Sequence, residues 1–125
     1  MSGDLDRTEI VLWVRGGGGR WSGRTVWVVV VDGEAYVRSA FGRRSAWYRR
    51  VLRRADTEVE VVAGVRLGVV LRPVAEPALV ERVSAAYRAK YGLYWPGPVE
   101  SMNGEEAAAA TLRLTDVGEV AQLSA

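Results

Sequence analysis

The most constraining feature of the sequence is a short apolar run that leads into a two-residue turn. The run is Val26–Val31, the turn is Asp32-Gly33, and the segment Glu34–Ser39 follows. The run is rich in β-branched residues and only six residues long, which is typical of a strand covered on both faces. Asp-Gly suits a hairpin turn because both of its central positions need positive φ. The sequence therefore predicts a β-hairpin, and we expect the rest of the chain to build around it.

Four other segments show strand patterns: 8–15, 57–62, 65–74 and 111–114. The first of them is apolar on both faces, because alternate residues of a strand point to opposite sides. Ile10, Leu12 and Val14 share one face, and Val11 and Trp13 share the other. We also expect Val26–Val31 to be covered on both faces. One small barrel interior does not need that much apolar surface, so we expect a homodimer.

A run of four glycines, Gly16–Gly19, interrupts the chain after the first predicted strand, and the loop continues to Arg24. Glycine gives the backbone unusual freedom. The run is either an anion cradle of main-chain N–H groups or a flexible hairpin connection. It is not a P-loop, since neither Gly-Lys-Ser/Thr nor a helix follows it.

Two helices are predicted outside the strands. The first runs from about Ser45 to Arg54, with Ser45 as its N-cap. Its apolar residues fall on one arc and four arginines on the other, which we expect to be solvated: Arg49, Arg50, Arg53 and Arg54. The second helix begins near Pro77 and ends at Gly92. Residues 93–109 are expected to form a loop, in which 105–110 can make a short helical turn.

The composition narrows the functional classes. The chain has 125 residues, which indicates one domain over 1–125, with ends at 1–7 and 115–125 expected to be weakly ordered. It has no histidine and no cysteine, which excludes histidine-based catalysis, thiolate nucleophiles and soft metal sites, so we expect no metal. No apolar run of about 18 residues predicts a membrane span. The polar N-terminus is unlike a signal peptide, so a cytoplasmic location is expected. A net charge of +2 makes nucleic acid an unlikely partner.

The order of the predicted elements is β-ββ-α-ββ-α-β. It predicts an α+β fold, a small six-stranded split β-barrel, mostly antiparallel, with two outer helices. With these residues, the order resembles the flavin-binding split β-barrel superfamily, which includes pyridoxamine-phosphate-oxidase-like proteins and deazaflavin-dependent nitroreductases. The chain is most similar to a small uncharacterised bacterial family within it. The resemblance covers about residues 9–114 and is carried by Gly19–Arg24, Val31–Gly33, Tyr36–Ser39, Ala46–Arg49, Val83–Tyr87, Lys90–Gly92 and Thr111–Leu114.

The resemblance implies a bound FMN or deazaflavin cofactor, often at a dimer interface. It also implies a phosphate site near the end of the third strand and the start of the next helix. In this sequence the matching residues are Ser39, Arg43, Arg44 and Ser45. Physical chemistry points the same way, because a helix start flanked by arginines attracts anions. For Arg43 and Arg44, a solvated charge pair is the alternative.

Three further residues are candidates for the cofactor site. Trp27 either lines the flavin ring or belongs to the core. Trp47, on the apolar face of its helix with Tyr48, is a core residue or part of the cofactor pocket. Lys90, the only lysine, falls on the core-facing stripe of its helix. Its ammonium group either reaches past the helix end to water or points into a cavity.

Three functional hypotheses remain. The first is a flavin- or deazaflavin-dependent oxidoreductase that acts on a small organic molecule, with the cofactor supplying the chemistry. The second is a non-redox small-molecule-binding protein, or a cofactor-independent enzyme, on the same fold. A third and weaker hypothesis, nucleic-acid binding by the arginine face, predicts a steep salt dependence.

Overall fold

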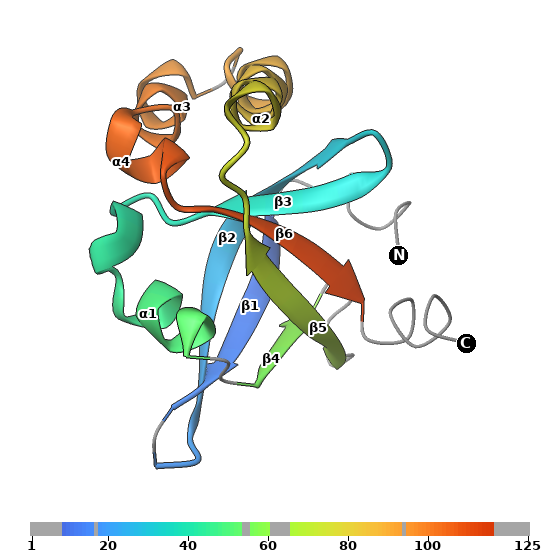
Figure 1. The fold of residues 1–125 in the computed structure, drawn as a ribbon, viewed down its shortest axis with the longest axis vertical. Helices are drawn as coiled ribbons and strands as arrows, with labels where there is room; N and C mark the ends of the chain where they lie inside the picture. The colour runs from blue at the N-terminus through green and yellow to red at the C-terminus, as the bar shows by residue number, and fades with distance from the viewer. Residues whose placement is uncertain (1–8, 17, 54–55, 61–65, 94, 117–125) are drawn as a thin grey trace.

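The computed structural model of the protein describes residues 9–16, 18–53, 56–60, 66–93 and 95–116. Six strands close into a barrel in the order β1-β2-β3-β6-β5-β4, with antiparallel neighbours throughout (Figure 1). Their bounds are Glu9–Arg15 (β1), Trp21–Val31 (β2), Glu34–Arg38 (β3), Thr57–Glu60 (β4), Arg66–Pro73 (β5) and Thr111–Asp116 (β6). The predicted six-stranded antiparallel barrel is confirmed. The predicted weakly ordered segment 1–7 lies outside the described residues, and so does that at 115–125 except for 115 and 116, which belong to β6. The connection between the predicted strands 57–62 and 65–74 also lies outside them.

The predicted hairpin is present. Val31 and Glu34 face each other across β2 and β3, and Asp32 and Gly33 form the turn between them. Their φ angles are 52° and 80°, so both central positions are left-handed, as the Asp-Gly sequence predicts.

The strand β2 begins earlier than expected, at Trp21 rather than Val26. Trp21 pairs with Arg15 and Gly23 pairs with Trp13, so residues predicted to form a loop extend the ladder with β1. The sequence signal was weak because Trp21 is followed by four polar or glycine residues, Ser22–Thr25, with no apolar alternation. The connection is correspondingly short, and Gly19 in it has a φ of 81°.

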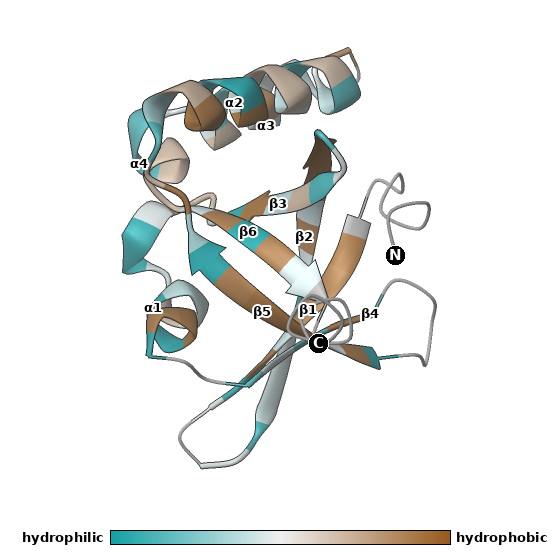
Figure 2. Ribbon diagram, turned by 45° about the vertical axis from the view of Figure 1, so that its right-hand side comes forward, coloured by the Kyte–Doolittle hydropathy of each residue, from teal (hydrophilic) through white to brown (hydrophobic). Residues whose placement is uncertain are grey.

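The barrel interior holds one apolar cluster, and the helices cover a second cluster on its outer face. Helix α1 (Ala46–Leu52) lies against β1 and β5 and completes the first cluster, whereas α2 (Pro77–Tyr91) covers β2. The inner cluster includes Ile10, Leu12, Val14, Val26, Val28, Ala35, Val37, Trp47, Tyr48, Val51, Val59, Val69, Leu71, Ala110, Leu112 and Leu114. The outer cluster includes Val29, Tyr36, Val74, Val83, Tyr87, Tyr91, Val99 and Met102. Accordingly, β1 and β5 carry long hydrophobic stretches, while α2 alternates between hydrophobic and hydrophilic residues (Figure 2).

The helices corrected one prediction. The expected loop at 93–109 contains a helix that was not predicted, α3 (Pro96–Met102), whereas α4 (Glu105–Ala108) falls where a short helical turn was expected at 105–110. The prolines at the start of α3 suggested a turn, but proline is tolerated in a first helical turn, where the N–H groups have no helical partner. Val99 and Met102 bury one face of α3 in the outer cluster. In Figure 1, α2, α3 and α4 gather on one side of the barrel, apart from α1.

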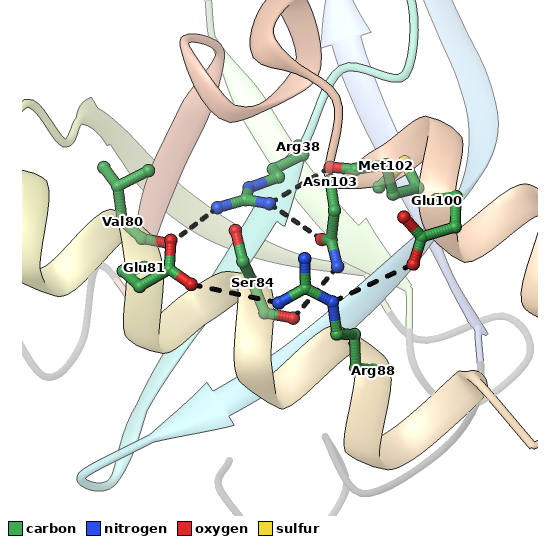
Figure 3. Close-up of polar contacts among 8 residues, drawn as sticks. All are labelled: Arg38, Val80, Glu81, Ser84, Arg88, Glu100, Met102 and Asn103. Carbon is green, nitrogen blue, oxygen red and sulfur yellow. Dashed lines mark hydrogen bonds and ion pairs between the residues drawn. The ribbon is translucent and has the colours of Figure 1, made fainter.

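A buried arginine ties these helices to the barrel (Figure 3). Arg38, the last residue of β3, is only 2% exposed. Its Nε donates to Thr111 Oγ1 at 2.9 Å, and its Nη2 donates to the carbonyl of Val80 at 2.8 Å. Its Nη1 donates to the carbonyl of Met102 at 3.0 Å and to Asn103 Oδ1 at 3.1 Å. One side chain therefore joins β3, β6, α2 and the end of α3.

Burial lowers the pKa of Arg38 from its ordinary value, and the charges of Tyr87 and Glu81 oppose that effect. The guanidinium also lies 5.4 Å from the ring centroid of Tyr87. Its hydrogen-bond partners in the described chain are neutral oxygens, so the charge is stabilised by dipoles rather than by a direct ion pair. Ion pairs lie beside these hydrogen bonds. The Nη1 of Arg88 is 3.8 Å from Glu81 Oε1, and its Nε is 3.9 Å from Glu100 Oε1.

Candidate functional site

The predicted phosphate site is built where β3 ends and α1 begins. The hydroxyl oxygens of Ser39 and Ser45 lie 2.6 Å apart, within hydrogen-bond distance, and either can be the donor. The chain returns to this point through a 3₁₀ helix, Gly42–Arg44, and Gly42 has a φ of 73°. Ser39 is buried and Ser45 is half-buried, so Ser45 is the more accessible of the two.

One role predicted for Ser45 is wrong. It occupies the N-cap position of α1, but its side chain makes no capping hydrogen bond, because the hydroxyl is engaged with Ser39. The helix has seven residues, shorter than the predicted segment of 45–54. Arg53 follows it, and Arg54 lies outside the described residues.

The two arginines of the 3₁₀ helix differ in their surroundings. Arg44 donates to Glu106 of α4 at 2.9 Å, and both side chains are largely exposed. Arg43 is exposed and forms no ion pair with any carboxylate in the described parts of the chain. Burial raises the pKa of Tyr48, and the positive charge of Arg43 partly opposes that rise. Arg43 is therefore the arginine that remains available to a ligand.

Trp47 belongs to the core. It is 5% exposed, packs edge-to-face with Tyr48 at a centroid distance of 6.2 Å, and forms part of the inner cluster. The core alternative for this residue therefore agrees with the structure, and its ring presents no open face for a flavin.

Trp27 and Lys90 lie on the opposite side of β2 from Trp47. Trp27 stacks on Tyr91 at 4.4 Å, with Trp95 at 5.7 Å, and packs against the outer cluster. The ammonium of Lys90 donates to the carbonyl of Val28 at 2.9 Å and lies 5.3 Å from the Tyr91 ring. The structure therefore does not bring all seven predicted site residues together: Trp27 and Lys90 lie on the outer side of β2, whereas Trp47 belongs to the inner cluster. Ser39 and Ser45 meet where β3 ends and α1 begins.

Sequence reasoning missed a cavity of about 770 Å³ beside α1. It is lined by Trp21, Val51, Leu52, Asp56, Thr57, Glu58 and residues 68–73 of β5, and by none of the seven predicted site residues. A volume of this size falls in the range of small-molecule sites. No sequence signal could have revealed the cavity, because it depends on how α1 lies against β5.

An arginine lies between two tryptophans, one of which, Trp21, lines this cavity. The Arg66 guanidinium lies 4.2 Å from the Trp13 ring centroid and 4.9 Å from that of Trp21. Its Nε lies 2.8 Å from a carboxylate oxygen of Glu58. Such stacking favours a fixed, planar arrangement of the cation. Two residues that line the cavity, Trp21 and Glu58, therefore both contact this arginine.

Two classes of site are not found in the described residues. They contain no group of three or more acidic, histidine or cysteine side chains arranged to hold a metal ion. Among the described helices, none combines the length and the apolar character needed to cross a bilayer.

The closed six-stranded barrel with helices on its outside places this protein among the split-barrel folds. The chain belongs to the bacterial family DUF2255, described as an uncharacterized protein conserved in bacteria, whose model matches residues 10–114. No curated protein sequence is significantly similar to it. The predicted link to deazaflavin-dependent nitroreductases stays a prediction.

Solved structures with the same fold come from several bacteria. A conserved hypothetical protein from Mycobacterium tuberculosis, Rv2991, is 17% identical with a TM-score of 0.67, over 93% of this chain and 78% of that chain. A Listeria innocua protein provisionally assigned as a pyridoxamine 5'-phosphate oxidase is 12% identical with a TM-score of 0.65, over 92% and 89%. The heme storage protein HutZ from Vibrio cholerae is 14% identical with a TM-score of 0.65, over 90% and 84%. At such identities the likeness establishes the fold alone.

Proposed function

We propose that the protein binds a flavin-type cofactor, FMN or a deazaflavin, and uses it to oxidise or reduce a small organic molecule. The observation that carries the proposal is the pair of hydroxyls of Ser39 and Ser45, 2.6 Å apart, next to the available cation Arg43. Split-barrel neighbours that include a provisional pyridoxamine 5'-phosphate oxidase support it.

The hydroxyl pair suits a phosphate. Each serine hydroxyl has one hydrogen to donate and two lone pairs, and a phosphate oxygen accepts hydrogen bonds readily. Ser45 is the more exposed partner, so it would contact the phosphate, while buried Ser39 would hold its hydroxyl in place. Arg43 would supply a charge-assisted hydrogen bond. Arg44 would hold the 3₁₀ helix against α4 through Glu106.

A flavin would supply the hydride or electron transfer, and the protein residues would bind and orient it. This division suits a chain with no histidine and no cysteine. Haem fits this sequence less well, because histidine and cysteine are two of its usual axial ligands. We also expect two copies of the chain to associate, since Phe41 is 76% exposed and Leu93 is 81% exposed.

A titration tests the proposal. We would measure the dissociation constants of FMN and of a deazaflavin by fluorescence for the wild type, Ser45→Ala, Arg43→Ala and the control Arg53→Ala. Loss of one charge-assisted contact in Arg43→Ala should weaken binding roughly tenfold to a hundredfold. Arg53 is also exposed but follows the other end of α1, so its loss should change little. Equal losses in both arginine variants, or no binding to wild type, would contradict the proposal.

A second candidate is a non-redox small-molecule-binding protein. The observation in its favour is that the cavity of about 770 Å³ includes none of the residues expected to hold a flavin. Purified protein that is colourless and binds neither FMN nor the deazaflavin would support this candidate. A fragment screen followed through the indole N–H signal of Trp21 would then show whether the cavity takes a ligand.

A further inference from the structure

The second half of strand β5, beside the cavity of about 770 Å³, has a strand neighbour on one side only among the described residues. Strand β4 begins at Thr57, which faces Val69 of β5, and Asp56 directly before it belongs to no strand. In the described chain, residues 70–73 therefore pair with β6 alone. These four residues line the cavity, and helix α1 also contributes to its lining. The cavity thus lies beside an open length of strand edge.

The main chain of Leu71 offers a donor and an acceptor at this edge. Thr57 Oγ1 donates to the carbonyl of Val69 at 2.7 Å, so the main chain of Val69 faces the side of β4. Alternate residues of a strand direct their N–H and C=O groups to the same side, so those of Leu71 face that side too. Leu71 forms no main-chain hydrogen bond outside the sheet among the described residues. Pro73, the next residue on this side, has no N–H, so Leu71 alone offers both groups.

One cation that lines the cavity is not neutralised. Asp56 and Glu58 also line it, but their carboxylates lie 3.4 Å from Arg15 and 2.8 Å from Arg66. Arg72 is exposed, and it forms no ion pair with any carboxylate in the described parts of the chain. A ligand in this cavity would therefore meet one positive charge that still lacks a counter-charge.

Apolar side chains supply much of the remaining lining. Val51 and Leu52 come from α1, and Leu52 is 46% exposed. Trp21 is half-buried, and the guanidinium of Arg66 lies 4.9 Å from its ring centroid. An apolar group of a ligand would remove part of this surface from water, which favours binding.

We propose that the cavity binds an N-acylated amino acid with an apolar side chain. The amide N–H of the ligand would donate to the carbonyl of Leu71, and one carboxylate oxygen would accept from the N–H of Leu71. This is the exchange that two opposite residues of an antiparallel pair make. The other carboxylate oxygen would accept from Arg72 in a charge-assisted hydrogen bond. The apolar side chain would lie against the apolar lining.

The proposal names a ligand class for the second candidate function and rests on the same cavity, which contains none of the residues expected to hold a flavin. A wild-type protein that binds FMN but no acylated amino acid would overturn this proposal alone. A wild-type protein that binds the acylated amino acid but neither flavin would overturn the flavin function alone.

N-acetyl-L-phenylalanine is the probe. We would measure its dissociation constant by calorimetry for wild type, Arg72→Gln and the control Arg49→Gln, an exposed arginine of α1 outside the cavity. Arg72→Gln should weaken binding roughly tenfold to a hundredfold, as loss of one charge-assisted hydrogen bond does. Arg49→Gln should bind as wild type does. Unchanged affinity in Arg72→Gln, or an equal loss in Arg49→Gln, would show that the proposal is wrong.

Two altered ligands test the contacts from the other side. The carboxamide of the probe lacks the charge, so wild type should bind it roughly tenfold to a hundredfold more weakly, whereas Arg72→Gln should bind acid and carboxamide about equally. The N-methyl analogue lacks the amide N–H and should also bind weakly to wild type. If the N-methyl analogue binds as well as the probe, the ligand does not pair with Leu71 and the proposal is wrong.

Nuclear magnetic resonance locates the ligand. The amide signals of Leu71 and Arg72 should shift when the probe binds, and the absence of both shifts would contradict the proposal. The last residue of a peptide carries the same chemistry as a free acylated amino acid. Acetyl-Gly-Gly-Phe separates these two sources: tighter binding than that of the probe indicates the end of a peptide, and weaker binding indicates a free molecule.

Discussion

The Nη2 of Arg38 donates to the carbonyl of Val80 at 2.8 Å, which fastens the end of strand β3 to helix α2. Ser39 follows Arg38 directly in the chain, so the same contact fixes the position of the hydroxyl that meets Ser45. The candidate phosphate site and the covering of the barrel therefore depend on one side chain.

Replacing Arg38 by Met should destabilise the protein by about 3 kcal/mol or more, because several buried acceptors lose their donor at once. Arg38→Lys keeps the charge, but a single ammonium cannot reach Thr111, Met102 and Val80 together, so it should rescue little. Urea unfolding followed by circular dichroism measures both. If Arg38→Met were as stable as the wild type, the hydrogen bonds of this guanidinium would not be needed for stability.

Replacing Gly33 by Val should cost more than about 1 kcal/mol, because a β-branched residue resists positive φ. Gly33 has a φ of 80°, and a Cβ there would meet nothing within 4 Å, so backbone conformation alone is tested. Gly33→Asn is the matched control, since asparagine tolerates this region. A denaturant melt compares the two, and equal stabilities would contradict the role given to the turn.

Replacing Gly23 by Ala should destabilise the barrel by about 1–3 kcal/mol, because a Cβ there would lie 2.7–2.9 Å from the Trp13 ring. The ring would have to move, which would also disturb the stack with Arg66. Gly97→Ala is the control, because its Cβ would meet no atom within 4 Å. Chemical unfolding and tryptophan fluorescence should separate the two variants, and a silent Gly23→Ala would mean that Trp13 is free to shift.

Tyr87 should make the protein sensitive to alkali. Burial raises the pKa of this tyrosine above its ordinary value near 10, so it stays protonated in the folded state while the unfolded chain ionises. Its stabilising effect is complete below about pH 10 and is lost as the pH rises further, at about 1.4 kcal/mol per pH unit. Tyr87→Phe should flatten that slope without changing the slope below pH 9, about one unit under the unfolded pKa. The free energy of unfolding, measured by urea melts, would contradict the assignment if it fell equally steeply with pH in wild type and in Tyr87→Phe.

The protein should be a homodimer at tens of micromolar, roughly the range in which a stable dimer is seen. Light scattering measures this directly. Phe41→Glu and Leu93→Glu place a charge on two separate exposed apolar residues, and the variant that dissociates identifies the contact. If the wild-type protein is monomeric at all of these concentrations, the expectation of a homodimer is wrong.

The sequence predicted the local elements better than their contacts. The hairpin turn was readable because Asp32 and Gly33 are chemically suited to positive φ, and α2 was readable from its proline start and apolar stripe. Helix α3 was missed because its prolines serve equally well in a turn, and only burial of Val99 and Met102 decides the matter.

The candidate site shows the same limit. The meeting of Ser39 and Ser45 was predictable from the way a strand end and a helix start adjoin. The separation of Trp27 from Trp47 was not, because it depends on the side of β2 that each tryptophan occupies. Burial of Arg38 was equally hidden, since an arginine at an alternate position of a strand usually faces water.

The pairing of β1 with β4 closes the barrel, so within the described residues each strand has a neighbour on both sides. A sheet with free edges offers rows of unused main-chain donors and acceptors, on which other chains can add strands and grow into fibrils. Among the described residues no strand is an edge strand along its whole length, although β2 pairs with β1 only over Trp21–Trp27 and with β3 only over Val28–Val31. We therefore expect copies of this chain to associate through side chains rather than by adding strands to the barrel, so that single surface substitutions would change the strength of association.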